Sequence, residues 1–100
     1  MDTYVRKQYE TRSRVIKALA HPTRLFFLDK LAEGEHCVCE LQAMVGADIS
    51  TVSKHLSVLR QAGLIDYEKR GNQVFYRLLT PCVHQFIHCI DEVTRTPAPE

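Results

Sequence analysis

Residues 50–78, STVSKHLSVLRQAGLIDYEKRGNQVFYRL, combine two periodicities that together decide the fold. In the first half, Val52, Leu56 and Leu59 recur at the spacing of an amphipathic helix, which ends at Gly63. In the second half, two runs of β-branched and aromatic residues alternate with polar ones and meet at a Gly-Asn pair. The stretch therefore predicts a helix followed by a two-stranded hairpin.

Outward from this stretch, the sequence predicts four more helices. Apolar residues at helical spacing indicate helices over residues 2–20, from Pro22 to a stop at Gly34, and over VCELQAMVG. The short turn GADIS joins the third helix to the helix that follows it, which makes a helix-turn-helix. A last helix opens at Thr80-Pro81. The order predicts a mainly α winged helix-turn-helix with a two-stranded β-hairpin wing.

Composition sets the broad class of the protein. The chain has 100 residues, of which 45% are hydrophobic and 25% charged, and this predicts one globular domain over residues 1–95 with a flexible tail at 96–100. No apolar run is long enough to cross a bilayer and the N-terminus does not resemble a secretory signal, so we expect a cytoplasmic protein without membrane contact. The net charge of +1 means that any binding to polyanions must come from local clusters of cations.

Two such clusters predict contacts with double-stranded DNA. A recognition helix meets base edges and phosphates with its N-terminal half, and polar residues gather there on the helix that starts near Ser50. A basic hairpin would reach the flanking phosphates. The predicted contacts are Ser50, Thr51, Ser53, Lys54 and His55 on the helix, and Lys69, Arg70 and Arg77 on the wing.

The first and last helices each carry an apolar stripe that one small core cannot cover on every side. Pairing these stripes across a twofold axis would bury them, so we expect a homodimer through the first and last helices. Such a dimer would place its recognition helices about 34 Å apart, on successive major grooves of a palindromic site.

Cys37 and Cys39 lie one residue apart where the third helix begins. In a reducing cytosol they could be ligands, a redox pair or buried apolar residues. Residues i and i+2 of a regular helix point to different sides, so both sulfur atoms converge only if the first turn is unwound or Cys37 precedes the helix. A helix N-terminus favours thiolates, which suit both soft ions and oxidation.

The segments HPTRL, SKHLSVLRQAGL and FYRL, in this order and spacing, resemble the ArsR/SmtB family of bacterial metal-responsive repressors over residues 15–79. The resemblance implies a homodimer that sits on operator DNA and leaves it when an inducer binds. Within the family, CVCEL resembles the CVCDL motif of the arsenic and cadmium/lead sensors. This resemblance implies that Cys37 and Cys39 bind trivalent arsenic or antimony, with Cd(II), Pb(II) or Zn(II) as alternatives, and that the protein serves in arsenical resistance.

A third ligand is not evident beside the two cysteines. Gln42 stands where arsenic sensors often carry another cysteine, so a third sulfur would come from Cys82, Cys89 or an external thiol, or the ion would be bound by two sulfur atoms alone. On the last helix, His84 and His88 share a face with Asp91, which makes a zinc site chemically feasible. The spacing of the family's zinc sensors is not reproduced there, and we expect an exposed polar face and a packed or interface role for Cys89.

Two other functions compete with a metalloid-responsive repressor. On the same DNA-binding fold, the cysteines could form a redox or persulfide switch, because exposed low-pKa thiols oxidise reversibly. An enzyme is the third class. Cys-x-Cys differs from the Cys-x-x-Cys of thiol oxidoreductases, and the sequence shows neither a nucleophile triad nor a phosphate-binding glycine loop, so we expect no catalytic activity.

Overall fold

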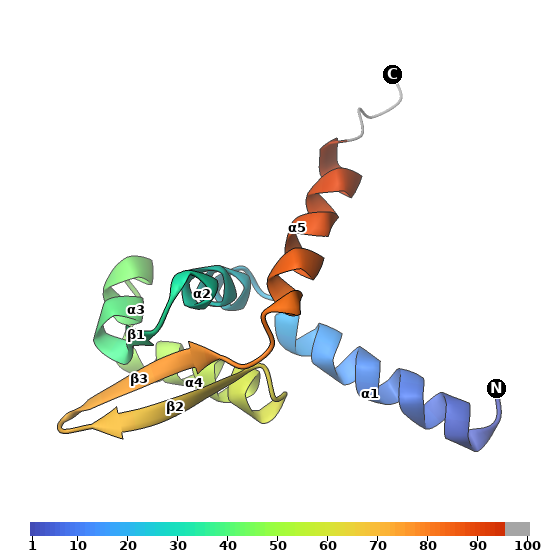
Figure 1. Cartoon of the computed structure of the whole chain (residues 1–100), viewed down its shortest axis with the longest axis horizontal. Coiled ribbons are helices and arrows are strands. Elements are labelled where there is room, and N and C mark those ends of the chain that lie inside the picture. The colour runs from blue at the N-terminus through green and yellow to red at the C-terminus, as the bar shows by residue number, and fades with distance from the viewer. Residues whose placement is uncertain (96–100) are drawn as a thin grey trace.

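The computed structural model describes residues 1–95, and the predicted tail at 96–100 lies outside this range. Its five helices and the β2–β3 hairpin follow the predicted order, with one additional short strand between the second and third helices (Figure 1). Within residues 1–95, no helix is both long and apolar enough to cross a membrane. The elements are α1 (Thr3–Leu19), α2 (Pro22–Glu33), β1 (His36–Cys37), α3 (Val38–Val45), α4 (Ile49–Gln61), β2 (Ile65–Arg70), β3 (Gln73–Leu78) and α5 (Cys82–Arg95).

Side-chain caps set the starts of the helices. Asp2 caps α1 through a hydrogen bond from the Val5 N–H, and the ring of His21 accepts one from the Thr23 N–H at the start of α2. His21 is therefore the N-cap of α2. The last helix begins at Cys82, slightly later than predicted, because Thr80 and Pro81 form the turn that leads into it.

The β-sheet has three strands and not the two that the sequence predicts. The predicted hairpin of β2 and β3 is present, and its register places Tyr67 opposite Tyr76. The additional strand β1 pairs antiparallel with the other edge of β3, so that His36 faces Tyr76 and Cys37 faces Phe75. β1 has two residues, which is too short to show any periodicity in the sequence. It ties the start of α3 to the wing.

The hydrophobic core lies where α2, α3 and α4 meet the sheet. Val52, Leu56 and Leu59 of α4 are completely buried, as the helical pattern predicts. Each fully buried leucine contributes roughly 1.5–3 kcal/mol through removal of its side chain from water. No polar or charged side chain within residues 1–95 is buried. The other large, completely buried side chains are Phe27, Leu28, Leu41 and Ile65.

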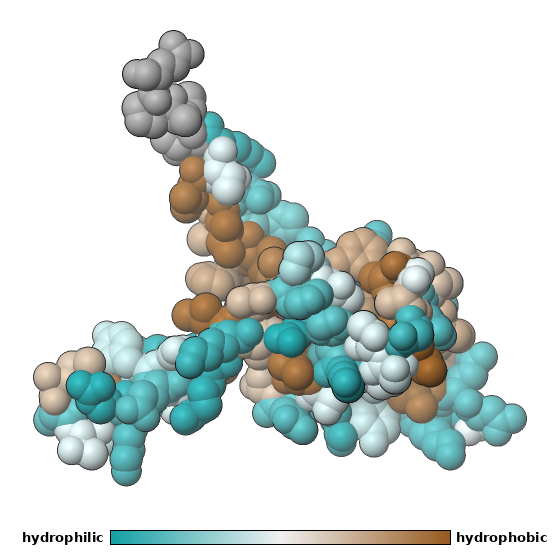
Figure 2. All heavy atoms as spheres, turned by 180° about the vertical axis from the view of Figure 1, so that it is seen from behind, coloured by the Kyte–Doolittle hydropathy of each residue, from teal (hydrophilic) through white to brown (hydrophobic). Residues whose placement is uncertain are grey.

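α1 and α5 project from this core in different directions (Figure 1). The radius of gyration is 15.7 Å, against about 13 Å for a compact domain of this length. The predicted apolar stripes consequently remain open to solvent, and hydrophobic residues line α5 in Figure 2. Ile16 on α1 is 53% exposed, and Phe86 and Ile90 on α5 are 44% and 42% exposed. A single chain therefore leaves both stripes largely uncovered.

Candidate DNA interface and thiol site

The N-terminus of α4 is held by Asp48. One carboxylate oxygen of Asp48 accepts hydrogen bonds from the Thr51 N–H and the Ser50 hydroxyl, each over 2.8 Å. The backbone N–H of Thr51 is the main cause that lowers the pKa of Asp48, and the Ser50 hydroxyl adds to it. Gly46 ends α3 in the left-handed conformation, with φ +67°, and permits the tight turn into Asp48. This turn and cap fix the direction of α4.

The predicted contacts on α4 do not all have the same surroundings. Thr51, Ser53 and Lys54 are exposed and available to a ligand. His55 is half-buried, and its Nδ1 accepts a hydrogen bond from Nε of Arg24 on α2 over 3.1 Å. Burial, followed by the nearby charges of His21 and Arg24, lowers the pKa of His55. His55 thus joins α2 to α4 as well as facing the surface.

Arg24 is a candidate site residue that the sequence did not reveal. With residues of α4 it lines a surface hollow of about 430 Å³, and the hollow also contains Thr51, Lys54 and His55. Arg24 lies in the HPTRL segment, far from α4 in sequence. The sequence therefore does not show that Arg24 is close to α4, because only the packing of α2 on α4 brings the two together. Two cations and an imidazole around one hollow suit a phosphate group.

The three predicted contacts on the wing differ in whether their side chains already form ion pairs within the chain. Lys69 is exposed, and its side chain has no ion-pair or hydrogen-bond partner within residues 1–95. Arg70 pairs with Glu35 at 2.9 Å and with Glu68 at 3.1 Å, and these carboxylates raise the pKa of Arg70. Arg77 lies along β3, not at the tip, with its guanidinium 3.7 Å from an Asp66 oxygen. Lys69 is therefore the most available cation of the wing.

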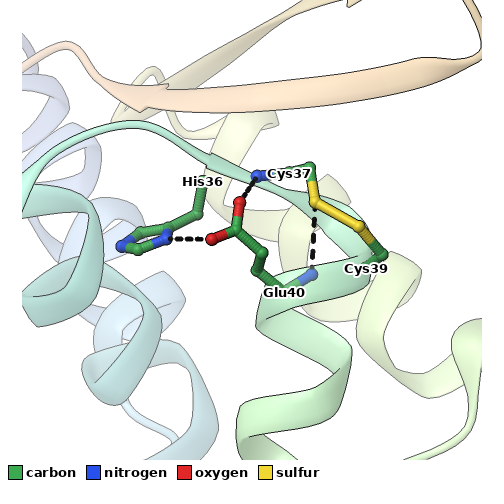
Figure 3. The surroundings of a disulfide bond; sticks show 4 residues. All are labelled: His36, Cys37, Cys39 and Glu40. Atoms are coloured by element: carbon green, nitrogen blue, oxygen red, sulfur yellow. Dashed lines mark hydrogen bonds and ion pairs between the residues drawn. A yellow bond between two sulfur atoms is a disulfide. The ribbon is translucent and has the colours of Figure 1, made fainter.

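The two cysteines of CVCEL form a disulfide in this structure (Figure 3). Of the two geometries that let the sulfur atoms converge, the chain adopts the second, because Cys37 precedes α3 as its extended N-cap. A disulfide is the oxidised state of the redox pair that the sequence left open beside metal ligation. Cys37 is buried and Cys39 is exposed, so only one of the two sulfur-bearing residues meets solvent freely.

Glu40 completes a capping box around Cys37. The Cys37 sulfur accepts a hydrogen bond from the Glu40 N–H, while the Glu40 carboxylate accepts one from the Cys37 N–H over 3.0 Å (Figure 3). The same carboxylate lies 3.3 Å from Nδ1 of His36. The backbone N–H of Cys37, followed by His36, lowers the pKa of Glu40. His36 is therefore a partner of the cap and does not point at the sulfur atoms.

Neither proposed third sulfur joins this pair within one chain. Cys82 and Cys89 lie on α5 as free, exposed thiols. Within residues 1–95, the only three metal-ligating side chains that come together are Asp29, His84 and His88. The histidines of α5 therefore do not form the purely solvated face that we expected, because both contact Asp29 on α2.

Comparison with known proteins agrees with this architecture. The sequence model described as "Bacterial regulatory protein, arsR family" matches residues 21–67. An HTH-type transcriptional regulator of Methanocaldococcus jannaschii is 35% identical over 88 residues, which cover 87% of this chain and 99% of that protein. The chain belongs to the arsR family. It is a DNA-binding transcriptional regulator of the ArsR/SmtB type with a winged helix-turn-helix.

Two solved structures are similar to this arsR-family chain over nearly its whole length. The transcriptional repressor BigR from Xylella fastidiosa is 30% identical, with a TM-score of 0.77, over 99% of this chain and all of that one. A homodimeric winged helix-turn-helix DNA-binding domain from Mycobacterium bovis is 29% identical, with a TM-score of 0.80, over 94% of this chain and 87% of that one. Some of the neighbours of this fold are thus homodimers.

Proposed function

We propose that this arsR-family chain is a homodimeric repressor that binds operator DNA and leaves it when Cys37 and Cys39 react with an inducer. The observation that carries the proposal is the position of Cys37. Its side chain caps α3, and its backbone pairs with Phe75 of β3. A change at Cys37 therefore acts on both DNA-binding elements, because α3 packs on α4 and β3 belongs to the wing.

DNA binding is assigned to α4 and to the wing. The exposed Thr51, Ser53 and Lys54 would enter the major groove with the N-terminal end of α4, while Lys69 would reach a flanking phosphate. A dimer formed through α1 and α5 would cover the open apolar stripes and present two copies of α4 to a palindromic operator. A regulator of this kind works in the cytoplasm, where thiols are kept reduced.

The inducer that we propose first is trivalent arsenic or antimony. In the reduced protein, Cys37 and Cys39 would supply two thiolates whose sulfur atoms already converge, and soft ions prefer such ligands. A third position would remain for an external thiol, since Cys82 and Cys89 do not come to the pair within one chain. Binding would draw the Cys37 sulfur away from the Glu40 N–H and weaken the cap of α3. Cd(II), Pb(II) and Zn(II) are alternative inducers.

A second candidate function is a redox switch, and the Cys37–Cys39 disulfide favours it. A peroxide would oxidise the two thiols: one sulfur–sulfur bond forms, both thiol protons and two electrons leave, and hydrogen peroxide is reduced to two waters. The disulfide would then be the state that is released from DNA. A persulfide donor would transfer its outer sulfur to one of the two thiols and leave as a thiol, and attack by the other cysteine would then form the same disulfide and release hydrogen sulfide.

Operator binding, titrated at one fixed salt concentration, separates these functions. Reduced wild-type protein, Cys37→Ser, Cys39→Ser and the matched control Cys89→Ser are each exposed to arsenite, cadmium, zinc and hydrogen peroxide. We expect all four to bind the operator, and we expect arsenite to release the wild type and Cys89→Ser alone. Release by peroxide without a response to arsenite would establish the redox switch. Normal release of both Cys37→Ser and Cys39→Ser would remove these residues from either mechanism.

A further inference from the structure

Asp29, His84 and His88 form a three-residue cluster between α2 and α5. One oxygen of Asp29 lies 3.1 Å from Nδ1 of His84 and 3.2 Å from Nε2 of His88. The two imidazole rings lie with their centroids 4.4 Å apart, one helical turn from each other on α5. One ligand atom from each residue lies within 4.8 Å of the others. The cluster is therefore preassembled by the packing of α2 on α5.

These distances fit a tetrahedral zinc ion. Zinc binds histidine nitrogen and carboxylate oxygen at about 2.0–2.2 Å, which places neighbouring ligand atoms of a tetrahedron roughly 3.3–3.5 Å apart. The observed separations from the Asp29 oxygen are only slightly shorter. The ligand atoms of the two histidines lie within 4.8 Å of each other, and rotation of the exposed imidazole rings would bring them to the tetrahedral separation when an ion binds. Zinc accepts two histidines and one carboxylate, with water in its fourth position.

Asp91 supplies an independent feature of a metal site. While Nε2 of His88 faces Asp29, its other ring nitrogen, Nδ1, lies 3.5 Å from an Asp91 oxygen. Histidines that bind metals usually present their second ring nitrogen to a carboxylate, which fixes the tautomer and the ring orientation. Asp91 would thus hold His88 with Nε2 unprotonated and aimed at the ion.

No lysine or arginine side chain within residues 1–95 pairs with Asp29. Its neighbour Lys30 turns instead to Glu33, at 3.3 Å, and the two histidines are the side chains found against the Asp29 carboxylate. The side chains of His84 and Asp29 are 42% and 36% exposed, so an ion can enter from solvent and keep a water ligand. The exposure of the cluster, the types of its ligands and its geometry therefore all favour the binding of a zinc ion.

We propose that Asp29, His84 and His88 bind one zinc ion per chain and thereby join α2 to α5. The site is separate from Cys37 and Cys39 and stands whether or not those residues sense an inducer. Because the ion would lie between α2 and α5, it would also affect how the helices are oriented relative to one another. α2 holds α4 through Arg24 and His55, so zinc would fix the orientation of the DNA-reading helix relative to α5.

Zinc binding by the oxidised full-length chain, without a histidine tag, tests the site. Oxidation keeps Cys37 and Cys39 in their disulfide, and Cys82→Ser/Cys89→Ser serves as the background, so no thiolate is available. Affinity is measured by competition with a chromogenic zinc chelator, and circular dichroism checks the fold of each variant. We expect one zinc per chain, an absence of competition by magnesium, and a visible spectrum of the cobalt-substituted protein that is typical of tetrahedral nitrogen and oxygen ligands.

The variants give each residue a distinct expectation. Asp29→Asn, His84→Gln and His88→Gln should each weaken zinc binding by more than ~100-fold, whereas Asp91→Asn, which changes only the outer carboxylate, should cost about 10–100-fold. His36→Gln is the matched control and should bind as the background does. Unchanged binding by Asp29→Asn would overturn the proposal, because the ion would then sit on α5 without α2. Failure of the background protein to bind zinc would overturn it as well.

A second measurement needs no variant in the cluster. In the histidine ring NMR spectrum of the background protein, substoichiometric zinc should shift the signals of His84 and His88 and leave those of His21, His36 and His55 in place. Shifts confined to the other histidines would contradict the site even if a variant of the cluster failed to fold.

Discussion

Arg24 on α2 donates a hydrogen bond from Nε to Nδ1 of His55 on α4 over 3.1 Å. Because a guanidinium can only donate, the Nδ1 of His55 must be unprotonated and its Nε2 must carry the hydrogen. The His21 ring lies beside the His55 ring, with centroids 4.2 Å apart. These contacts connect α2 to α4 through His21, Arg24 and His55. The Nε2–H of His55 remains available as a donor to a base edge.

This contact predicts that the stability of the protein depends on His55 in mildly acidic solution. The pKa of His55 is lowered in the folded state, chiefly by burial, so the unfolded chain binds the proton more readily. The resulting stabilisation is fully present above the unfolded pKa, about 6.5, and is lost as the pH falls through the folded pKa. We expect the free energy of unfolding to decrease below about pH 6.5 in urea titrations. His55→Gln should show a smaller decrease, while Ser57→Ala on the same helix should keep it. An equal decrease in the free energy of unfolding for all three proteins would contradict this role of His55.

Lys54 is predicted to contact an operator phosphate. Lys54→Ala should weaken binding to specific and nonspecific DNA by a similar factor and should reduce the slope of log affinity against log salt by about 1. Fluorescence anisotropy over a series of salt concentrations measures this slope. Arg95→Ala removes the same charge at the far end of α5, where Arg95 contacts Glu92, and should leave the slope unaltered. A slope that Lys54→Ala does not change would exclude a phosphate contact.

The wing allows a comparison of neighbouring cations. The Lys69 side chain has no partner within residues 1–95. Arg70, in contrast, is held by Glu35 and Glu68 and lies over Phe75, with 4.8 Å to the ring centroid. Lys69→Ala should therefore lower DNA affinity and the salt slope without lowering the melting temperature. Arg70→Ala should lower the melting temperature by a few degrees, because it releases the wing from the segment before β1, and should affect the slope less. The reverse ranking in anisotropy and thermal melts would show that Arg70 is the DNA contact.

The fold could be predicted from sequence where periodicity is long and local. Three buried residues of α4, Val52, Leu56 and Leu59, define its inner face, and the alternation along β2 and β3 predicts the hairpin that the structure shows. β1 could not be predicted in this way, since its two residues become a strand only through pairing with β3. Secondary structure that depends on tertiary pairing leaves no repeat in the chain.

The candidate site was predictable in its residue types and less so in its contacts. The cysteine pair stands out in the sequence, and its convergence follows from the extended N-cap at Cys37, one of the two geometries that the spacing allows. The contacts of Arg24 with His55 and of Asp29 with His84 span 31 and 55 positions. Only helix packing creates such pairs, so the sequence could show His84 and His88 sharing a face but could not supply the carboxylate of α2.

The apolar stripe of α5 predicts how the protein assembles. Phe86 and Ile90 are 44% and 42% exposed in a single chain, in contrast with the buried Val83 at the start of the same helix. A homodimer through α1 and α5 would cover them, and a charge placed there would have to lose its hydration on association. Phe86→Asp should therefore weaken the dimer about 30-fold or more, since loss of a central aromatic anchor costs roughly 2 kcal/mol or more. Sedimentation over a range of concentrations measures the dissociation constant.

Gln85→Asp is the control for this prediction, because it introduces the same charge on an exposed polar position of α5 and should leave the dimer intact. Operator affinity should fall together with dimerisation, because both half-sites must be occupied at once, and a Phe86→Asp protein that remains dimeric would place the subunit interface elsewhere on the chain.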